Sequence, residues 1–102
     1  MSRKAQVEAL LADDPDNSMF RYALAMEHVS AGDDAAAVRE FREILRRDGD
    51  YVPAYLQAGR ALIRLGDDDD ARAILHAGIV VGRRVGDEHA AGEMQGFLES
   101  LG

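Results

Sequence analysis

The feature that most constrains this chain is an internal repeat with a period of 34 residues. Shifting the sequence by one period superposes turn on turn and apolar residue on apolar residue: Gly32 on Gly66, Ala37 on Ala71, and Phe41 on Leu75. Applied toward the N-terminus, the same shift aligns Leu10 and Leu11 with Ile44 and Leu45, so the first segment corresponds to the second half of a repeat. A period of this length is typical of stacked units that hide each other's apolar surfaces.

Within each period the apolar residues follow helical spacing. Val38, Phe41, Ile44 and Leu45 share one face, charged residues fill the others, and the alternation expected of a strand is missing. The pattern therefore predicts an all-α fold of about six helices. Their expected ranges are 3–13, 17–31, 34–47, 53–65, 69–85 and 88–100.

Glycine and aspartate mark the turns between these helices. Gly32 and Gly66 can adopt the left-handed conformation that ends a helix, and the aspartates after them can cap the next one. The run Asp67 to Asp70 lies at the positive end of a helix dipole, with Arg83 and Arg84 near its negative end. The ligand spacing and central glycine of a calcium loop are absent. We interpret the run as a capping turn, with weak and nonspecific cation attraction as the alternative.

Composition indicates one domain, residues 1–102, with a formal net charge of −7 and no cysteine. Such acidity disfavours binding to nucleic acid or to anionic lipid, which both rely on clustered basic residues. The missing cysteines exclude disulfides and thiolate chemistry. No apolar run is long enough for a signal peptide or a membrane span. We therefore expect a soluble, cytoplasmic protein.

The repeat resembles the tetratricopeptide repeat, whose pattern has large and small residues at fixed positions of a helix pair. The matching residues are Leu24, Ala25, Ala37 and Phe41 in one unit, and Tyr55, Ala58, Gly59, Leu62, Ala71 and Leu75 in the next. Pro15 matches a closing proline. Arg21 and His28 stand where aromatic residues are expected, and Gly49 and Arg83 where the later prolines are expected.

The resemblance implies an antiparallel helix-pair solenoid. Its expected parts are a half repeat at 3–16, full repeats at 17–50 and 51–85, and a capping helix at 86–102. Met94, Phe97, Leu98 and Leu101 form one apolar stripe on that last helix. Small residues such as Gly59 and Ala71 would let paired helices approach closely.

The resemblance also implies a non-catalytic module that binds a peptide or partner helix in a concave groove. Carrying the family's groove positions across gives Met19, Tyr22, Met26, Val29, Ser30, Leu56, Arg60, Ile63 and Arg64. Methionine and tyrosine suit an adaptable binding surface. The alternative is that these residues pack in the protein's own core, or that the last helix covers part of the groove.

Arg60 and Arg64 lie one helical turn apart and could hold a carboxylate together, as some relatives do with such residues, or could be a solvated pair. The histidines, His28, His76 and His89, lack the further ligands of a zinc site. We find no catalytic constellation, no metal site and no implied cofactor. Self-association through the same apolar face stays open as an alternative, and a hidden metal site or enzyme is the third hypothesis.

Overall fold

The computed structural model describes residues 1–102 and consists of six α-helices without a strand. The helices are α1 (Arg3–Asp13), α2 (Ser18–Ser30), α3 (Asp34–Arg47), α4 (Val52–Arg64), α5 (Asp68–Arg84) and α6 (Glu88–Leu101). Every end lies within one residue of the range expected from the sequence. The predicted all-α, six-helix fold is therefore confirmed.

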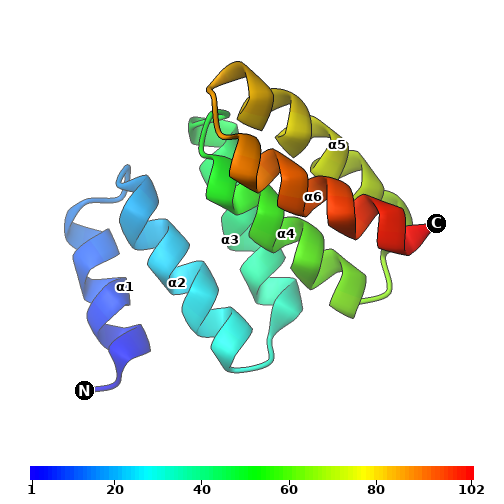
Figure 1. Ribbon diagram of the computed structural model, residues 1–102. Helices are drawn as coiled ribbons and strands as arrows, with labels where there is room; N and C mark the ends of the chain where they lie inside the picture. The colour runs from blue at the N-terminus through cyan, green and yellow to red at the C-terminus, as the bar shows by residue number, and fades with distance from the viewer.

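The helices form a stack in which each packs against the next, and α6 packs on α4 as well as on α5. Figure 1 shows α6 in front of α4 and α3 behind it, with α1 and α2 at the opposite end of the molecule from α5 and α6. The stack is elongated, with principal extents of 42 × 28 × 19 Å. None of its helices combines the length and the apolar character needed to cross a lipid bilayer.

Small residues allow the paired helices to approach each other closely. Ala37 and Ala71 are fully buried, as are Ala25 and Ala58 on the helices that precede theirs. A β-carbon at Gly59 of α4 would lie 2.7 Å from Cγ of Leu75 on α5, closer than real carbon atoms approach. The small residues at these repeat positions are therefore required by the interhelical distance.

The main core runs through the stack from α2 to α6. Its largest fully buried side chains are Phe41, Ile44, Leu75 and Met94. Helix α1 contributes no residue to this cluster and buries only Leu11 elsewhere. The N-terminal half repeat, helix α1, therefore packs on α2 and lies outside the main core.

Two of the turns have the left-handed backbone conformation that the sequence predicted. Gly32 and Gly66 have φ angles of +78° and +80°, a left-handed conformation that glycine adopts without strain. The side chain of Asp33 caps α3 by accepting a hydrogen bond from the amide of Ala36 at 3.1 Å. Asp67 occupies the equivalent position before α5, but its side chain makes no capping hydrogen bond. That part of the capping prediction was wrong, because a place at a helix start does not fix the carboxylate's rotamer.

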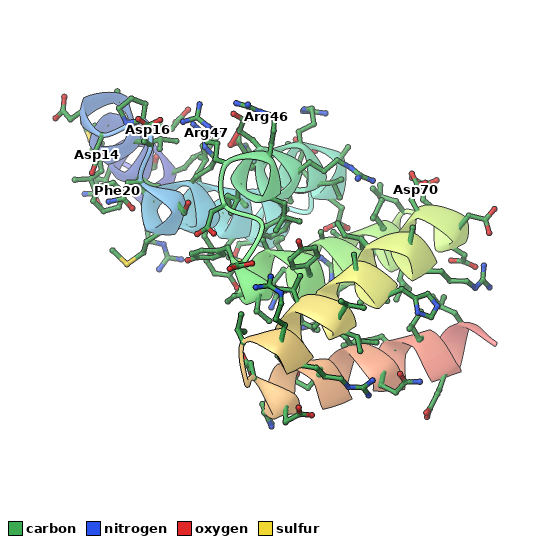
Figure 2. The ribbon with its side chains drawn as sticks, turned by 90° about the horizontal axis from the view of Figure 1, so that it is seen from above. Asp14, Asp16, Phe20, Arg46, Arg47 and Asp70 are labelled. Atoms are coloured by element: carbon green, nitrogen blue, oxygen red, sulfur yellow. The ribbon has the colours of Figure 1, made fainter.

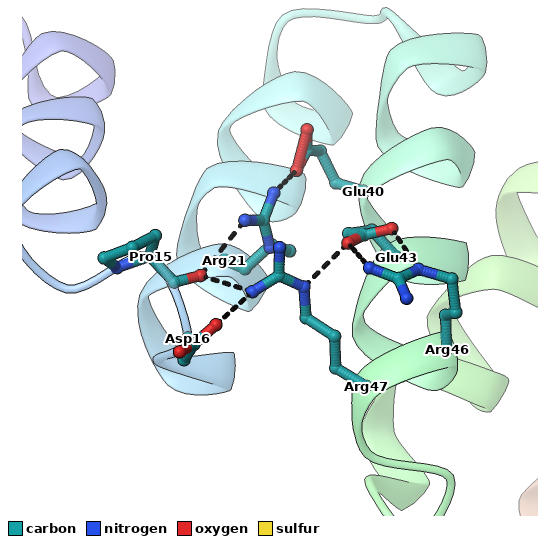
Figure 3. Close-up of polar contacts among 7 residues, drawn as sticks. All are labelled: Pro15, Asp16, Arg21, Glu40, Glu43, Arg46 and Arg47. Carbon is teal, nitrogen blue, oxygen red and sulfur yellow. Dashed lines mark hydrogen bonds and ion pairs between the residues drawn. The ribbon is translucent and has the colours of Figure 1, made fainter.

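An ion-pair network ties the turn between α1 and α2 to α3, as Figure 3 shows. Arg47 donates to the carbonyl oxygen of Pro15 at 3.0 Å and to a carboxylate oxygen of Asp16 at 2.5 Å. Arg21, at a position where the repeat pattern has an aromatic residue, donates to the same carbonyl at 3.2 Å and to Glu40 at 3.0 Å. The departure from the pattern thus replaces an apolar contact with a polar one.

Candidate functional site

The residues expected to line a groove all lie on α2 and α4, the first helices of the two full repeats. On α2, Met19 is 63% exposed. Met26 and Val29 are partly buried and pack against the core. Ser30, at the end of the helix, is exposed. The α2 side of the candidate site therefore ranges from open surface to core edge.

Tyr22 takes part in both the core and the surface. Its ring centroid lies 5.8 Å from that of Phe41 and 5.7 Å from that of Tyr51, in tilted arrangements that are favourable for aromatic pairs. Burial, with a smaller effect from neighbouring Tyr51, raises the pKa of Tyr22 above its ordinary value. The side chain is consequently a neutral part of the packing between α2, α3 and the start of α4.

On α4, the two arginines have different surroundings. The guanidinium of Arg60 lies over the ring of Phe97 on α6, with its central carbon 5.6 Å from the ring centroid. Arg64 instead donates from Nε and Nη2 to the carboxylate of Asp34 on α3, at 3.0 and 2.9 Å. Because Arg64 is already paired with Asp34, Arg60 and Arg64 do not form the free pair of arginines that the sequence alone allowed.

A cavity of about 310 Å³ lies between α4 and α6. It is lined by Arg60, Ile63, Arg64, Phe97 and Ser100. A second cavity, of about 370 Å³, shares Phe97 and Ser100 with the first and is lined by α6 alone: Glu93, Gly96, Phe97 and Ser100. The structure therefore brings together three of the expected residues, all from α4, while Leu56 and the α2 residues lie outside both cavities.

Phe97 and Ser100 were not predicted as site residues, because the apolar stripe of the last helix was interpreted as core and cap. The repeat period offers no signal for them, because a 34-residue shift aligns Ser100 with Gly66. In the structure, α4 begins at Val52 and α6 at Glu88, an offset of 36 residues. This offset makes Ser100 the counterpart of Arg64. Helix α6 thus occupies the place of the first helix of a further repeat, and its residues continue the face formed by α2 and α4. We call the surface of these three helices the α2–α4–α6 face.

No residue of the acidic run and no histidine lines either cavity. Asp69 pairs with Arg72 at 3.1 Å, and Asp70 lies 3.7 Å from Arg42. Figure 2 shows Asp70 pointing outward at the start of α5. No group of three side chains of the kinds that ligate metals converges anywhere in the structure.

Comparison with known proteins shows that the chain belongs to the tetratricopeptide repeat family. The family's model, described as Tetratricopeptide repeat, matches residues 28–81. A curated relative, the TPR repeat-containing protein PA0015 of Pseudomonas aeruginosa, is 30% identical over 95 residues, which cover 93% of this chain and 90% of the relative. The family resemblance read from the sequence is therefore confirmed.

Two solved structures share the architecture. The crystal structure of a tetratricopeptide repeat domain protein from Salinibacter ruber superposes with a TM-score of 0.78 at 33% identity, covering 83% of this chain and 94% of that one. The solution structure of protein BPP2914 from Bordetella parapertussis gives a TM-score of 0.86 at 29% identity, covering 99% of this chain and 88% of that one. The match to the Bordetella protein includes α1 and α6.

Proposed function

We propose that this protein is a non-catalytic interaction module and that the α2–α4–α6 face binds a segment of a partner protein. The family's repeat fold is that of a protein interaction module. The observation that supports this face is the cavity of about 310 Å³ between α4 and α6, which combines apolar walls with a guanidinium. Such a mixture of apolar surface and a few polar groups is typical of binding sites.

Two exposed residues of the face allow a test without disturbing the core. Ser100 lines both cavities and is exposed, so Ser100→Trp would fill the space between α4 and α6. Met19→Asp would place a charge on the exposed apolar side chain of α2. We expect each variant to keep its melting temperature and to lose partners that the wild-type protein captures from an extract of its native cells.

Matched controls exist on α5, whose outer side faces away from the cavities. Ala77→Trp adds the same bulk at an exposed position, and Val80→Asp adds the same charge at a side chain that is 67% exposed, close to the 63% of Met19. Binding that survives Ser100→Trp and Met19→Asp but is lost with the α5 variants would place the site on the opposite side and contradict the proposal.

Self-association is the second candidate, because Met19 leaves apolar surface open on the same face. Light scattering of the wild-type protein and the Met19→Asp variant over a range of concentrations separates the two functions. A dimer that dissociates in the variant would support pairing of two copies through this face. A monomer at all concentrations would contradict self-association and leave a partner protein as the occupant of the face.

A further inference from the structure

Helix α6 is the only helix of the stack without an arginine or a lysine. It carries three carboxylates, those of Glu88, Glu93 and Glu99. Eight of the eleven arginines of the chain lie within 4.0 Å of a carboxylate oxygen, and none of those carboxylates is on α6. Part of the net charge of −7 therefore stays uncompensated on the helix that lines both cavities.

The cavity of about 370 Å³ that α6 lines alone, here called the α6 cavity, has one charged group and one large apolar group. Glu93 and Phe97 lie one helical turn apart, and Gly96 and Ser100 complete the wall. No atom lies within 4 Å of a β-carbon placed on Gly96, so the space beside the ring is open. The α6 cavity thus presents a carboxylate and an aromatic ring side by side on one helix face.

The carboxylate of Glu93 has no permanent cation beside it. The only basic nitrogen within 4.0 Å is Nε2 of His89, at 3.0 Å from Oε1, and an imidazole is charged only when it is protonated. The side chain of Glu93 is 45% exposed, so a partner can reach it. Glu93 is therefore an accessible anion at the rim of an apolar cavity.

Arg60 restricts how a ligand can lie against α6. Its guanidinium stacks on the ring of Phe97 and lines the neighbouring cavity, but it does not line the α6 cavity. A second cation placed against the same ring would be repelled by Arg60. A cation at Glu93, one turn closer to the start of α6, would be attracted instead, which leaves the ring of Phe97 for an apolar part of the ligand.

We propose that the α6 cavity binds a lysine or arginine side chain of the partner segment, with its charged end at Glu93 and its aliphatic stem against Phe97. The inference rests on the proposed function and names the chemistry of the partner. Charge complementarity supports it, because a protein with a net charge of −7 attracts basic segments and repels acidic ones. Long basic side chains lay their stems on apolar surface and keep the charged end near water, which fits a ring and a half-exposed carboxylate one turn apart.

The experiment is a selection from random dodecapeptides on the full wild-type chain. Enriched peptides are synthesised with an acetylated N-terminus and an amidated C-terminus, so that side chains carry all of their charge, and affinities are measured by calorimetry. We expect one required lysine or arginine. Replacing it by its uncharged analogue, norleucine or citrulline, should weaken binding by roughly fivefold, and so should Glu93→Gln in the protein, the upper end for an ion pair of this exposure.

Combining the two changes distinguishes a contact from general attraction. If the basic residue meets Glu93, its replacement should change the affinity for the Glu93→Gln protein by less than about twofold. Glu88→Gln is the matched control, because it removes the same charge from an exposed position of the same helix that lines neither cavity. It should leave the affinity within about twofold of the wild type. Thermal melts of both variants confirm that each is folded.

The outcomes separate this inference from the proposed function. Enriched peptides without a required basic residue, whose binding is lost with Ser100→Trp, would overturn the inference and leave the interaction face standing. Equal losses with Glu88→Gln and Glu93→Gln, or peptide and protein changes that simply add, would also overturn it. A wild-type dimer that dissociates with Glu93→Gln would assign the cavity to a second copy and contradict a partner protein as its occupant. A library that yields no binding peptide would count against the proposed function and this inference together.

Discussion

Glycine residues inside the helices have opposite roles that depend on what faces them. At Gly78 of α5, a β-carbon would lie 2.5 Å from Sδ of Met94 and 2.5 Å from Cβ of Tyr55. At Gly96 of α6, no atom lies within 4 Å of such a carbon. The first glycine permits a three-helix contact, whereas the second only weakens its helix.

We therefore expect opposite effects from the same substitution. Gly78→Ala should lower the free energy of unfolding by about 1–3 kcal/mol through overpacking. Gly96→Ala should raise it by up to about 1 kcal/mol, because alanine is the better helix former. Urea unfolding of the two variants beside the wild type measures both, and equal effects would show that the α4–α5–α6 contact is looser than described.

The aspartates before α3 and α5 offer a second comparison at this scale. Asp33→Ala removes a carboxylate that caps α3 and should cost about 1 kcal/mol of stability. Asp67→Ala removes one that makes no capping bond and should cost clearly less. Thermal melts measure the loss of stability in the two variants. An equal loss would mean that Asp67 caps α5 in solution.

At the scale of elements, polar contacts between a helix end and the turn of the preceding repeat recur along the stack. Arg47 at the end of α3 pairs with Asp16, and Arg84 at the end of α5 pairs with Asp50. Asp16 and Asp50 are one 34-residue period apart, so each full repeat reaches back to its predecessor through the same kind of pair. Exposed pairs of this kind add little stability.

The network around Arg47 makes part of the stability dependent on pH. Hydrogen bonds from Arg46 and Arg47 lower the pKa of Glu43 from its ordinary value of 4.5 to about 2. Because the pKa is lower in the folded state, the contribution is complete above pH 4.5 and is lost as the pH falls toward 2. Between those values, the melting temperature of the wild type should fall more steeply than that of Glu43→Gln, and parallel curves would contradict this.

For the molecule as a whole, the two ends of the stack differ in how firmly they are held. Helix α1 packs on α2 and lies outside the main core. Helix α6 packs on both α4 and α5 and places Met94 fully in that core. The N-terminal end should therefore open locally before the C-terminal end does.

Hydrogen exchange measures this difference directly. We expect the amides of α1 to exchange fastest among the helices and those of α4 slowest, because α4 packs against α3, α5 and α6. Helix α6, terminal like α1 but integrated in the core, is the internal control. Equal protection in α1 and α6 would show that the hydrogen bonds to Pro15 and the ion pair of Asp16 fix the first helix as firmly as apolar burial fixes the last.

The sequence by itself determined the six helices, the turns at Gly32 and Gly66 and the repeat family, because these depend on periodicity and on backbone preferences that act over a few residues. It also located Arg60 and Arg64 on one helical face. Only the tertiary structure decided that Arg64 pairs with Asp34, 30 residues away, and that Phe97 lies beneath Arg60.

Those contacts depend on how far one helix is offset from the next and on which rotamer each long side chain adopts. Neither quantity is encoded in a local pattern. The cavity between α4 and α6 exists for the same reason, since its walls come from helices that meet only when the stack has formed.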